Sequence, residues 1–388
     1  MLGIIKVAYV GDFINHGKSL PTAGTSLVIM LSKITGVELV DVYCPSLNES
    51  TEQFEPPNNV KTKEYYNYNN PFSVLRLLKV EWKEYNMILF NLLPTAFGDS
   101  SLSNVIGLLL PLILSKLGRV KGVKVIYHNS VYTNDVVKLG YDSTWDQVRG
   151  FFLGLVERAL FKNIDSYVLL KLYKSRIDEA IGKNRVRYLN LRYLEAITTV
   201  YLNSAMDAEV LAKKQNEVPV VLMHGAWGPQ KNIELGLCAL KEIKDAGGKF
   251  RLVISGGINY HFPEYEKYFK ETLKKYADLG YNLIGPLPEK KIMDIFLEAD
   301  LLILPYNTPG GHSGVLEQAI FFDVPTIAIS FPEYVEQTSG LNNVHLAEQN
   351  DFKFIVKSMI SKIATNTKVN ITGKIINSLR NINVLIDD

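Results

Sequence analysis

Short apolar runs alternate with longer segments of helical periodicity through the first half of the chain. This alternation is typical of parallel strands joined by crossover helices. It predicts strands over residues 4–10, 37–43, 87–91, 123–127 and 167–170. It predicts helical segments over residues 27–34, 71–84, 101–117 and 145–161, whereas the Tyr- and Asn-rich stretch 65–70 is expected to be a loop.

The same pattern starts again after about residue 205. The apolar runs predict strands over residues 220–223, 250–255, 301–304 and 326–330. The periodic segments predict a helix that Pro229 opens and helices over 265–279, 289–299 and 313–322. The fold class is therefore α/β, with two doubly wound, Rossmann-like domains in tandem that would face a cleft. We expect the domains to span residues 1–205 and 206–365, with a linker near 203–218 and a terminal segment, 366–388, that packs back on the first domain.

Composition narrows the class of protein. The 388 residues are 47% hydrophobic and 21% charged, as in an ordinary soluble globular protein, and the net charge of +2 gives no reason to expect a nucleic-acid partner. The two cysteines, Cys44 and Cys238, form no disulfide framework, which suits a reducing compartment. The first residues lack the features of a signal peptide, so we expect a cytoplasmic location.

The longest apolar run covers residues 105–114 and contains Pro111. It is too short for a membrane span, which needs about 20 residues, and it is most simply a buried helix. An alternative is a shallow contact of residues 101–117 with the inner membrane face. Basic residues follow that stretch: Lys116, Arg119, Lys121 and Lys124.

One loop has the features of an anion-binding site. It lies in the stretch LLILPYNTPGGHSGVLEQ, where a buried strand is followed by Gly310 and Gly311 and then by a helix that Ser313 can cap. Such a helix start presents free N–H groups and positive dipole potential, and glycines, here also Gly314, let a phosphate approach closely. Glu317 follows one turn later, where a carboxylate can accept hydrogen bonds from the hydroxyls of a ribose. A glycine turn with a surface glutamate would look the same.

Three further loops follow predicted strands. VLMHGAWGPQKN brings Gly225 and Lys231 to a strand's carboxyl end, where an ammonium can neutralise a diphosphate. The sequence SGG contains Gly256, and GPLP contains Gly285 and Leu287, whose backbone can contact a nucleobase edge. Each of these signals is weak when taken alone.

In this order and spacing, the four loops resemble the carboxyl-terminal half of GT-B glycosyltransferases. The chain is most similar there to the retaining, nucleotide-sugar-dependent enzymes of glycosyltransferase family 4, over about residues 220–330. The resemblance implies that Lys231 holds the donor diphosphate and Glu317 the ribose. It also implies that the remaining donor-binding contacts come from Gly225, Gly256, Gly285, Leu287, Gly311, His312, Ser313 and Gly314.

Three positions depart from the family pattern. The donor-loop arginine is replaced by Ala226 and the glycine after the lysine by Asn232. The first glutamate of the family's E-x7-E pair, which faces the donor sugar, is replaced by Pro309. His312 and Ser313 would then take over polar contacts with the sugar.

The first half of the chain resembles the family less closely. Its first strand is followed by a loop with Gly17, Lys18 and Ser19, which would face the donor phosphates or the acceptor. Gly17, Lys18 and Ser19 match the GKS sequence that ends the P-loop motif of ATPases. The spacing does not match, because five residues separate Gly11 from Gly17 and the motif requires four. His128 follows the strand 123–127, where the family often has a histidine near the transferred sugar.

These observations predict a glycosyltransferase, specifically a hexosyltransferase, with Lys231, His128 and Glu317 as its catalytic groups. Its partners would be a nucleotide-sugar donor and a glycan, lipid-linked or small-molecule acceptor. The family's front-face reaction with retention needs no metal, and the other histidines show no metal-ligand spacing: His16, His224, His261 and His345. Two alternatives stay open, a sugar-nucleotide epimerase of the same architecture and a catalytically decayed nucleotide-binding relative.

Overall fold

The computed structural model describes residues 5–11, 13, 21–46, 56–68, 70–92, 96–97, 101–117, 122–133, 143–191, 218–259, 261–287 and 289–365. The chain divides into two compact units, whose described parts lie before residue 192 and after residue 217. The expected boundary at residues 205 and 206 and the terminal segment 366–388 lie outside the described residues. Both stay predictions.

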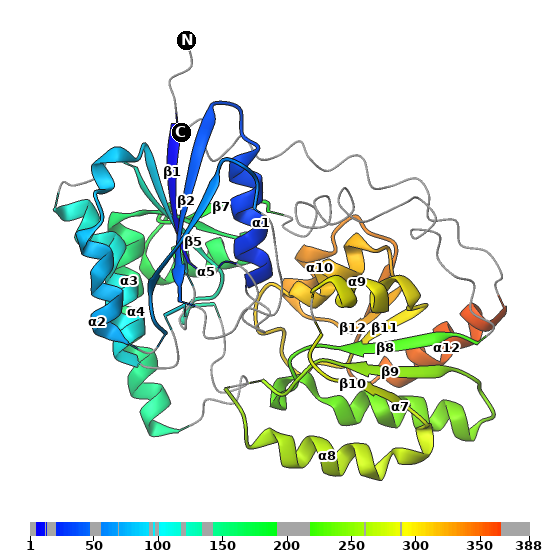
Figure 1. The fold of residues 1–388 in the computed structure, drawn as a ribbon. Coiled ribbons are helices and arrows are strands. Elements are labelled where there is room, and N and C mark those ends of the chain that lie inside the picture. Colours follow the sequence, from blue (N-terminus) through cyan, green and yellow to red (C-terminus); the bar gives the residue numbers. More distant parts are fainter. Residues whose placement is uncertain are drawn as a thin grey trace. The chain divides into compact units, whose positions relative to one another are not determined.

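The first unit contains a seven-stranded parallel sheet with strand order β3-β2-β1-β4-β5-β6-β7 (Figure 1). All residues of its two central strands β4 and β5 are buried, because helices cover both faces of the sheet. The strands are β1 (Ile5–Val10), β2 (Val37–Pro45), β3 (Val60–Tyr66), β4 (Met87–Leu92), β5 (Val123–Tyr127), β6 (Asp165–Val168) and β7 (Arg187–Tyr188).

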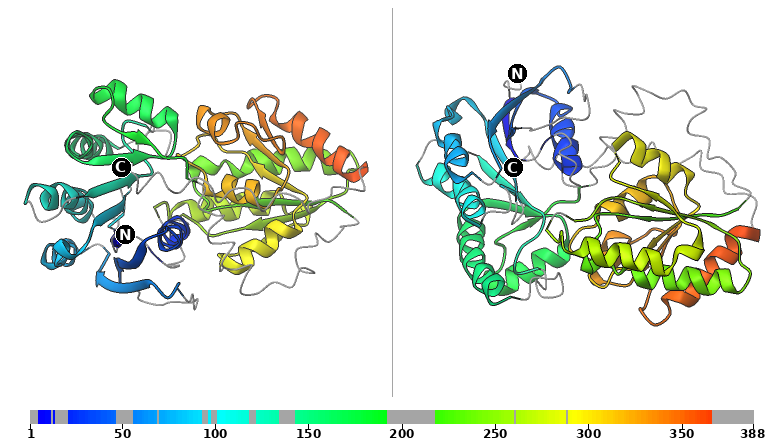
Figure 2. Two further views of the ribbon diagram at one scale, coloured as in Figure 1. Left: turned by 90° about the horizontal axis from the view of Figure 1, so that it is seen from above. Right: turned by 60° about the horizontal axis from the view of Figure 1, so that its bottom comes forward.

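The helices α2, α3 and α4 lie side by side on one face of this sheet, and α1 lies on the other (Figures 1 and 2). The helical segments of the first unit are α1 (Pro21–Ser32), α2 (Pro71–Val74), η1 (Leu75–Lys79), η2 (Trp82–Glu84), α3 (Ser101–Lys116), α4 (Thr144–Asn163) and α5 (Lys171–Ile181). Leu108, Leu110 and Leu114 of α3 are buried, which confirms the buried-helix interpretation of this stretch. Lys124, one of the basic residues named for the alternative membrane contact, is also buried and donates a hydrogen bond to Tyr167 Oη over 3.5 Å.

Three expectations for this unit were wrong in detail. Tyr65 and Tyr66 belong to β3 instead of a loop, because their strand pairs in parallel with β2. The continuous helix expected over residues 71–84 is divided into one α-helical turn and two 3₁₀ segments, since Val80 adopts an extended conformation. The strand expected over 167–170 begins earlier, at Asp165. The pattern also missed β7 and α5.

The second unit contains a six-stranded parallel sheet with strand order β10-β9-β8-β11-β12-β13. Its strands are β8 (Val220–His224), β9 (Arg251–Ser255), β10 (Asn282–Ile284), β11 (Leu301–Leu304), β12 (Thr326–Ile329) and β13 (Val344–Ala347). Its helical segments are η3 (Pro229–Lys231), α7 (Ile233–Asp245), α8 (Tyr265–Lys275), η4 (Ala277–Leu279), α9 (Glu289–Glu298), α10 (Gly314–Phe321), α11 (Pro332–Gln337) and α12 (Phe352–Thr365). The expected elements are present, but the helix expected to open at Pro229 is wrong at its start. Pro229 opens the 3₁₀ turn η3, and α7 begins only after the left-handed Asn232. The pattern did not anticipate β10, α11, β13 and α12.

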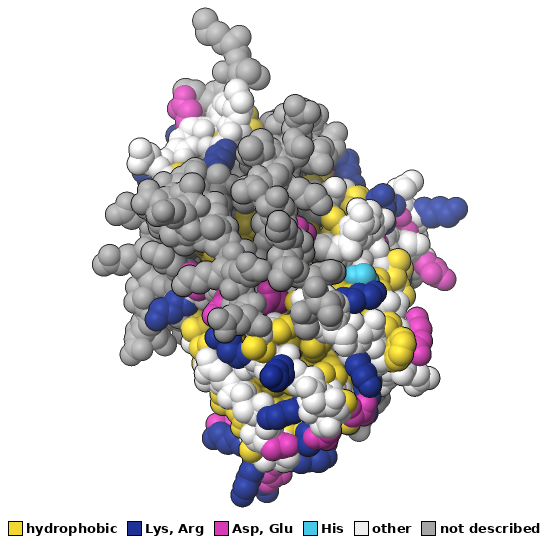
Figure 3. Space-filling view, turned by 90° about the vertical axis from the view of Figure 1, so that its right-hand side faces the viewer, with side chains coloured by type: hydrophobic (Ala, Val, Ile, Leu, Met, Phe, Trp, Pro, Cys, Tyr) yellow, Lys and Arg dark blue, Asp and Glu magenta, His cyan; other side chains and the backbone are white. Residues whose placement is uncertain are grey.

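Helices cover both faces of the second sheet, with α7 and α8 on one side and α9 and α10 on the other (Figure 1). On the face of the molecule drawn in Figure 3, Lys and Arg side chains are interspersed with Asp and Glu. One ion pair of the second unit joins Arg251 and Glu298 at 2.5 Å. The prediction of two doubly wound α/β units is confirmed, and the cleft expected between them stays a prediction.

Candidate functional site

The second sheet reverses its strand order beside β8. The chain passes from β8 to β9 and β10 on one side and then returns to β11 on the other. In open parallel sheets, ligands bind at the carboxyl ends of the strands where this reversal occurs. The loops after β8 and β11, which contain Lys231 and Tyr306, begin at this point.

Glycines let the loops after β8, β9 and β10 approach one another. Gly256 has φ +105°, and a Cβ atom there would lie 1.9 Å from the carbonyl oxygen of Gly225. A Cβ atom on Gly257 would lie 2.8 Å from Pro286 Cγ, so the loop with Gly285 also packs here. The three expected donor-binding loops are therefore brought together by contacts that only glycine permits.

Gly225 lies at the centre of this arrangement. It has φ +152°, and a Cβ atom on it would meet the Tyr306 hydroxyl at 3.3 Å and both Lys231 Cε and Val315 Cγ2 at 3.9 Å. Val315 belongs to the first turn of α10. The loop after β8 thus lies against Tyr306, two residues beyond the end of β11, and against the first turn of α10.

The Lys231 side chain is half-buried, and its Nζ lies 3.6 Å from the centre of the Tyr306 ring. This is the geometry of a cation–π interaction. Among the residues that the structure describes, no carboxylate forms an ion pair with Lys231. Burial lowers the pKa of Lys231 to about 7, because an ammonium without a counter-ion is costly to desolvate. The site therefore holds a cation that an anionic ligand would stabilise.

His224, at the end of β8, is a neighbour of Lys231 that the sequence did not single out. The side chain is buried against Phe296 at a ring-centre distance of 5.6 Å, and its Nδ1 has no hydrogen-bond partner among the described residues. Burial and, secondly, the charge of Lys231 lower the pKa of His224 to about 4. His224 is therefore neutral near pH 7. Of these two neighbouring side chains, only Lys231 carries positive charge at that pH.

The start of α10 has the expected structure. Gly310 and Gly311 have φ +63° and +107°, which favour glycine. Ser313 is the N-cap, and its Oγ accepts a hydrogen bond from the N–H of Leu316 over 3.3 Å, which confirms the predicted cap. Gly314 is exposed, and a Cβ atom there would meet nothing within 4 Å.

Glu317 is buried beside this helix start. Its Oε1 lies 3.2 Å from His312 Nε2 and accepts a hydrogen bond from Gln337 Nε2 over 3.2 Å. Gln337, the last residue of α11, also binds the backbone of Ser313. No motif had indicated Gln337, since α11 was not anticipated.

One of the three departures from the family pattern, Asn232, lies at the end of the loop after β8. Asn232 adopts the left-handed conformation, with φ +43°, that the family's glycine takes easily and that asparagine tolerates best among other residues. The neighbouring Trp227 anchors the loop, because its N–H donates to Gly257 O over 2.8 Å and its Nε1 to Ser255 O over 3.1 Å. The loop after β8 is thus held by a left-handed residue at Asn232 and by the hydrogen bonds of Trp227.

In the first unit, His128 lies at the carboxyl end of β5, as expected. It is buried, and its Nε2 lies 2.6 Å from Asn91 Oδ1 at the end of β4. Gly17, Lys18 and Ser19 lie outside the described residues, so their roles stay predictions.

A buried carboxylate supports the segment that follows His128. Glu157 of α4 accepts hydrogen bonds from Tyr127 Oη at 2.6 Å, Ser130 Oγ at 2.5 Å and the N–H of Val131 at 3.1 Å. Burial raises the pKa of Glu157 to about 7, although the three donors act in the opposite direction. Spacing on α4 gave no sign of this contact, because it joins residues of separate elements.

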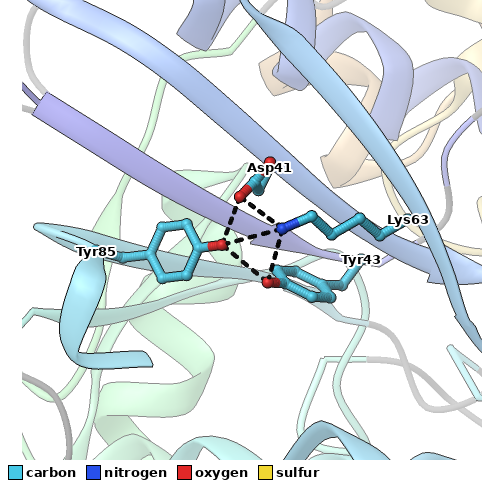
Figure 4. A network of polar contacts seen from close by, with 4 residues as sticks. All are labelled: Asp41, Tyr43, Lys63 and Tyr85. Atoms are coloured by element: carbon cyan, nitrogen blue, oxygen red, sulfur yellow. Dashed lines mark hydrogen bonds and ion pairs between the residues drawn. The ribbon is translucent and has the colours of Figure 1, made fainter. Parts of the chain in front are cut away.

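A second polar cluster lies in the same sheet, formed by Asp41, Tyr43, Lys63 and Tyr85 (Figure 4). Asp41 Oδ2 accepts hydrogen bonds from Lys63 Nζ over 2.7 Å and from Tyr85 Oη over 2.5 Å. Because Asp41 lies in the middle of β2, away from the carboxyl ends of the strands, we assign this cluster to the stability of the sheet.

Comparisons with known proteins concern the second unit and the fold. Residues 208–371 match the family model described as glycosyl transferases group 1. A search of curated protein sequences gives no match.

Three solved structures illustrate the similarity of fold. Sucrose-phosphate synthase from Thermosynechococcus elongatus is 15% identical, with a TM-score of 0.61 over 94% of this chain and 90% of that one. Anabaena HepE in complex with UDP and glucose is 13% identical, with a TM-score of 0.57 over 94% and 93%. A putative UDP-N-acetylglucosamine 2-epimerase from Listeria monocytogenes is 16% identical, with a TM-score of 0.56 over 93% and 90%. The fold is GT-B, and the matched domain together with the fold supports a glycosyltransferase.

Proposed function

We propose that this protein transfers a sugar, a hexose by the family resemblance, from a nucleotide-sugar donor to an acceptor hydroxyl, with retention of configuration. The observation that carries the proposal is the corner formed by Lys231, Tyr306 and the start of α10. There a cation that has no carboxylate partner in the described part of the chain adjoins a capped helix N-terminus. A diphosphate is the ligand that such a corner favours. Glu317, one turn into α10, supplies a carboxylate for the ribose hydroxyls.

The reaction needs charge stabilisation more than a protein nucleophile. The bond between the sugar and the diphosphate breaks, and negative charge develops on the leaving oxygen. Lys231 and the N–H groups that open α10 would stabilise this charge in place. The acceptor oxygen forms the new bond on the same face of the sugar, and its proton passes to the leaving diphosphate.

Other parts of the proposal follow the family resemblance. His128 would face the transferred sugar, Gly256 and the loop with Gly285 and Leu287 would face the base, and no metal would be required. A cytoplasmic protein acting at the inner membrane face, on a glycan or lipid-linked acceptor, fits this reading. The described part of the chain contains no helix with the length and hydropathy of a membrane span.

The donor is tested by measuring the melting temperature of the full chain with UDP, GDP, ADP and their sugar derivatives. Specific binding raises the melting temperature by mass action, and UDP is tried first because HepE was solved with it. We expect one nucleoside diphosphate to stabilise the wild-type protein and to stabilise the Lys231→Ala variant much less. No shift with any of them would contradict the proposal.

An epimerase is the second candidate, motivated by the epimerase of similar fold. Incubation with the binding donor alone distinguishes the two activities. An epimerase converts the donor sugar without an acceptor, whereas a transferase shows at most slow hydrolysis until an acceptor is added. Binding without either reaction would instead indicate the decayed relative that the losses at Ala226 and Pro309 suggested.

A further inference from the structure

His224 has a buried ring nitrogen that the surrounding structure leaves unpaired. The residue ends β8 and is 8% exposed, and its Nδ1 forms no hydrogen bond with the described part of the chain. Two further buried atoms at the same edge of the second sheet, Ser255 Oγ and Gln230 Oε1, also lack a partner among the described residues. Buried polar atoms are nearly always paired, and an unpaired one costs stability. Such atoms therefore mark a place where a bound molecule can complete the hydrogen bonds.

The backbone groups beside these side chains, in contrast, have partners. The carbonyl oxygen of His224 accepts a hydrogen bond from Tyr306 Oη over 3.4 Å. The carbonyl oxygen of Ser255 accepts from the N–H of Gly225 over 3.2 Å and from Trp227 Nε1 over 3.1 Å. The two strand ends are thus fixed in place, while polar atoms of their side chains stay available.

The side chains of His224 and Ser255 point to the same face of the sheet. The two residues lie opposite each other in the parallel pairing of β8 with β9, and side chains alternate between the two faces along a strand. The residues that share this face with them pack in a core cluster with residues of α9 and α10: Val220, Leu222 and Val253. Both side chains therefore lie on the face that α9 and α10 cover (Figure 1).

This face also carries two of the elements expected to bind the donor. The first turn of α10 lies beside Gly225, which directly follows His224. Ser255 is opposite Ile284 at the end of β10, so the row of residues that starts at His224 leads to the loop before α9. In that loop a Cβ atom on Gly285 would meet nothing within 4 Å, so there is open space for a ligand. A nucleotide that reaches from α10 to this loop would cross the end of β8.

The chemistry of His224 suits a nucleobase better than a phosphate. Burial and, secondly, the charge of Lys231 lower the pKa of His224 to about 4, so the ring is neutral near pH 7. A neutral imidazole has one N–H donor and one acceptor nitrogen, and the hydroxyl of Ser255 both donates and accepts. The edges of nucleobases present donors and acceptors, whereas an ionised diphosphate presents acceptors. Lys231 already supplies the positive charge that the diphosphate needs.

We propose that His224, with Ser255 beside it, forms hydrogen bonds with the nucleobase of the donor and selects that base. This inference rests on the proposed function and deepens it, because no sequence motif assigned a role to either side chain. A base with matching groups completes the hydrogen bonds that the protein alone leaves unmade. A base without them leaves buried polar atoms unpaired, and sites of this kind discriminate strongly between ligands.

The test is calorimetric titration of the full chain with UDP, GDP and ADP. His224→Phe keeps an aromatic ring against Phe296 and removes both ring nitrogens. It should bind the preferred nucleoside diphosphate about tenfold more weakly and the other two nearly as before, so the preference becomes smaller. Its melting temperature should equal or exceed that of the wild type, because an unpaired buried nitrogen is removed. His224→Asn, whose amide takes the place of Nδ1, should recover part of the lost affinity.

The matched control is His345→Phe, which replaces an exposed imidazole on β13 of the same unit and should bind all three ligands like the wild type. Equal losses for the three ligands in His224→Phe would mean contact with the ribose or the diphosphate and would overturn the assignment to the base. Unchanged affinities would remove His224 from the site. In both cases a nucleotide still binds the wild type, so the proposed function stands. If the wild type binds none of the three, the proposed function and this inference are both refuted.

Discussion

The side-chain amide of Gln337 forms hydrogen bonds with both backbone groups of Ser313. Gln337 Oε1 accepts from the Ser313 N–H over 3.2 Å, and Gln337 Nε2 donates to the Ser313 carbonyl over 2.9 Å. The same Nε2 also donates to Glu317. One amide thus fixes the N-cap of α10 and the carboxylate assigned to the ribose.

Replacing Gln337 with glutamate is expected to weaken binding of the nucleoside diphosphate by about tenfold. The new carboxylate cannot donate to Ser313 or Glu317 and repels Glu317, and a lost hydrogen bond to a charged group costs on the order of 1.5–3 kcal/mol. Calorimetric titration measures the effect. Glu336→Gln, a change at the adjacent, half-buried position, is the control, and unchanged affinity in Gln337→Glu would remove Gln337 from this role.

Replacing Lys231 with alanine should lower the transfer rate by about 10²-fold or more, as expected for one group that stabilises developing charge. Initial rates at saturating donor measure this change. Lys270→Ala, at an exposed lysine of α8 that pairs with Glu266, serves as the control. Wild-type rates in Lys231→Ala would refute the assignment.

The same lysine predicts a pH dependence of binding. Since burial lowers the pKa of Lys231 to about 7, the free protein loses this ammonium as the pH rises above 7. A bound diphosphate favours the ammonium, so binding must take up a proton at higher pH. Affinity for the nucleoside diphosphate should then fall by up to about tenfold per pH unit between pH 7.5 and 9, and Lys231→Met should lose this slope. Parallel slopes for both proteins would contradict the prediction.

Replacing Glu317 with glutamine should weaken a ribonucleoside diphosphate about tenfold, because the hydroxyls lose a charged acceptor. The corresponding 2′,3′-dideoxynucleoside diphosphate should be affected much less, since it has no vicinal hydroxyls to bind. Titration of both ligands against both proteins gives the comparison. Equal losses for the two ligands would indicate a structural role for Glu317.

The loop contacts are tested with two glycines of positive φ. Gly247, at φ +82°, has open space around it, whereas Gly256, at φ +105°, touches the backbone of Gly225. Gly247→Ala should cost about 1 kcal/mol through backbone strain alone. Gly256→Ala should lower the melting temperature several times more, because it also forces two loops apart. Similar losses in the two variants would mean that the loops separate easily.

Glu157 predicts a pH-dependent stability. Its pKa is about 7 in the folded chain and about 4.3 for an unfolded glutamate. Between these values the folded state binds the extra proton, so this group stabilises the fold at low pH and loses that contribution as the pH rises through 7. Glu157→Gln should therefore gain several degrees in melting temperature relative to the wild type between pH 5 and pH 8. A difference that is constant with pH would contradict this.

Local pattern was enough to predict most of the fold. The strands β4, β8 and β11 are almost entirely apolar because both faces of a parallel sheet are covered, and such a run is visible in the sequence. The pattern missed short edge strands such as β10, whose residues are exposed or half-buried. It also read Tyr65 and Tyr66 as a loop, because pairing with β2 is a non-local interaction.

The sequence by itself determined the two α/β units, the loops at the ends of the strands, and the candidate groups Lys231, Ser313 and Glu317. These follow from short-range chemistry: apolar periodicity, glycine, and capping side chains. Only the tertiary structure decided that Lys231 lies over Tyr306, that Gln337 joins Ser313 to Glu317, and that Phe151 and Phe152 stay outside the core. Those relationships join residues of separate elements or depend on which helix face meets the sheet, so no local pattern contains them.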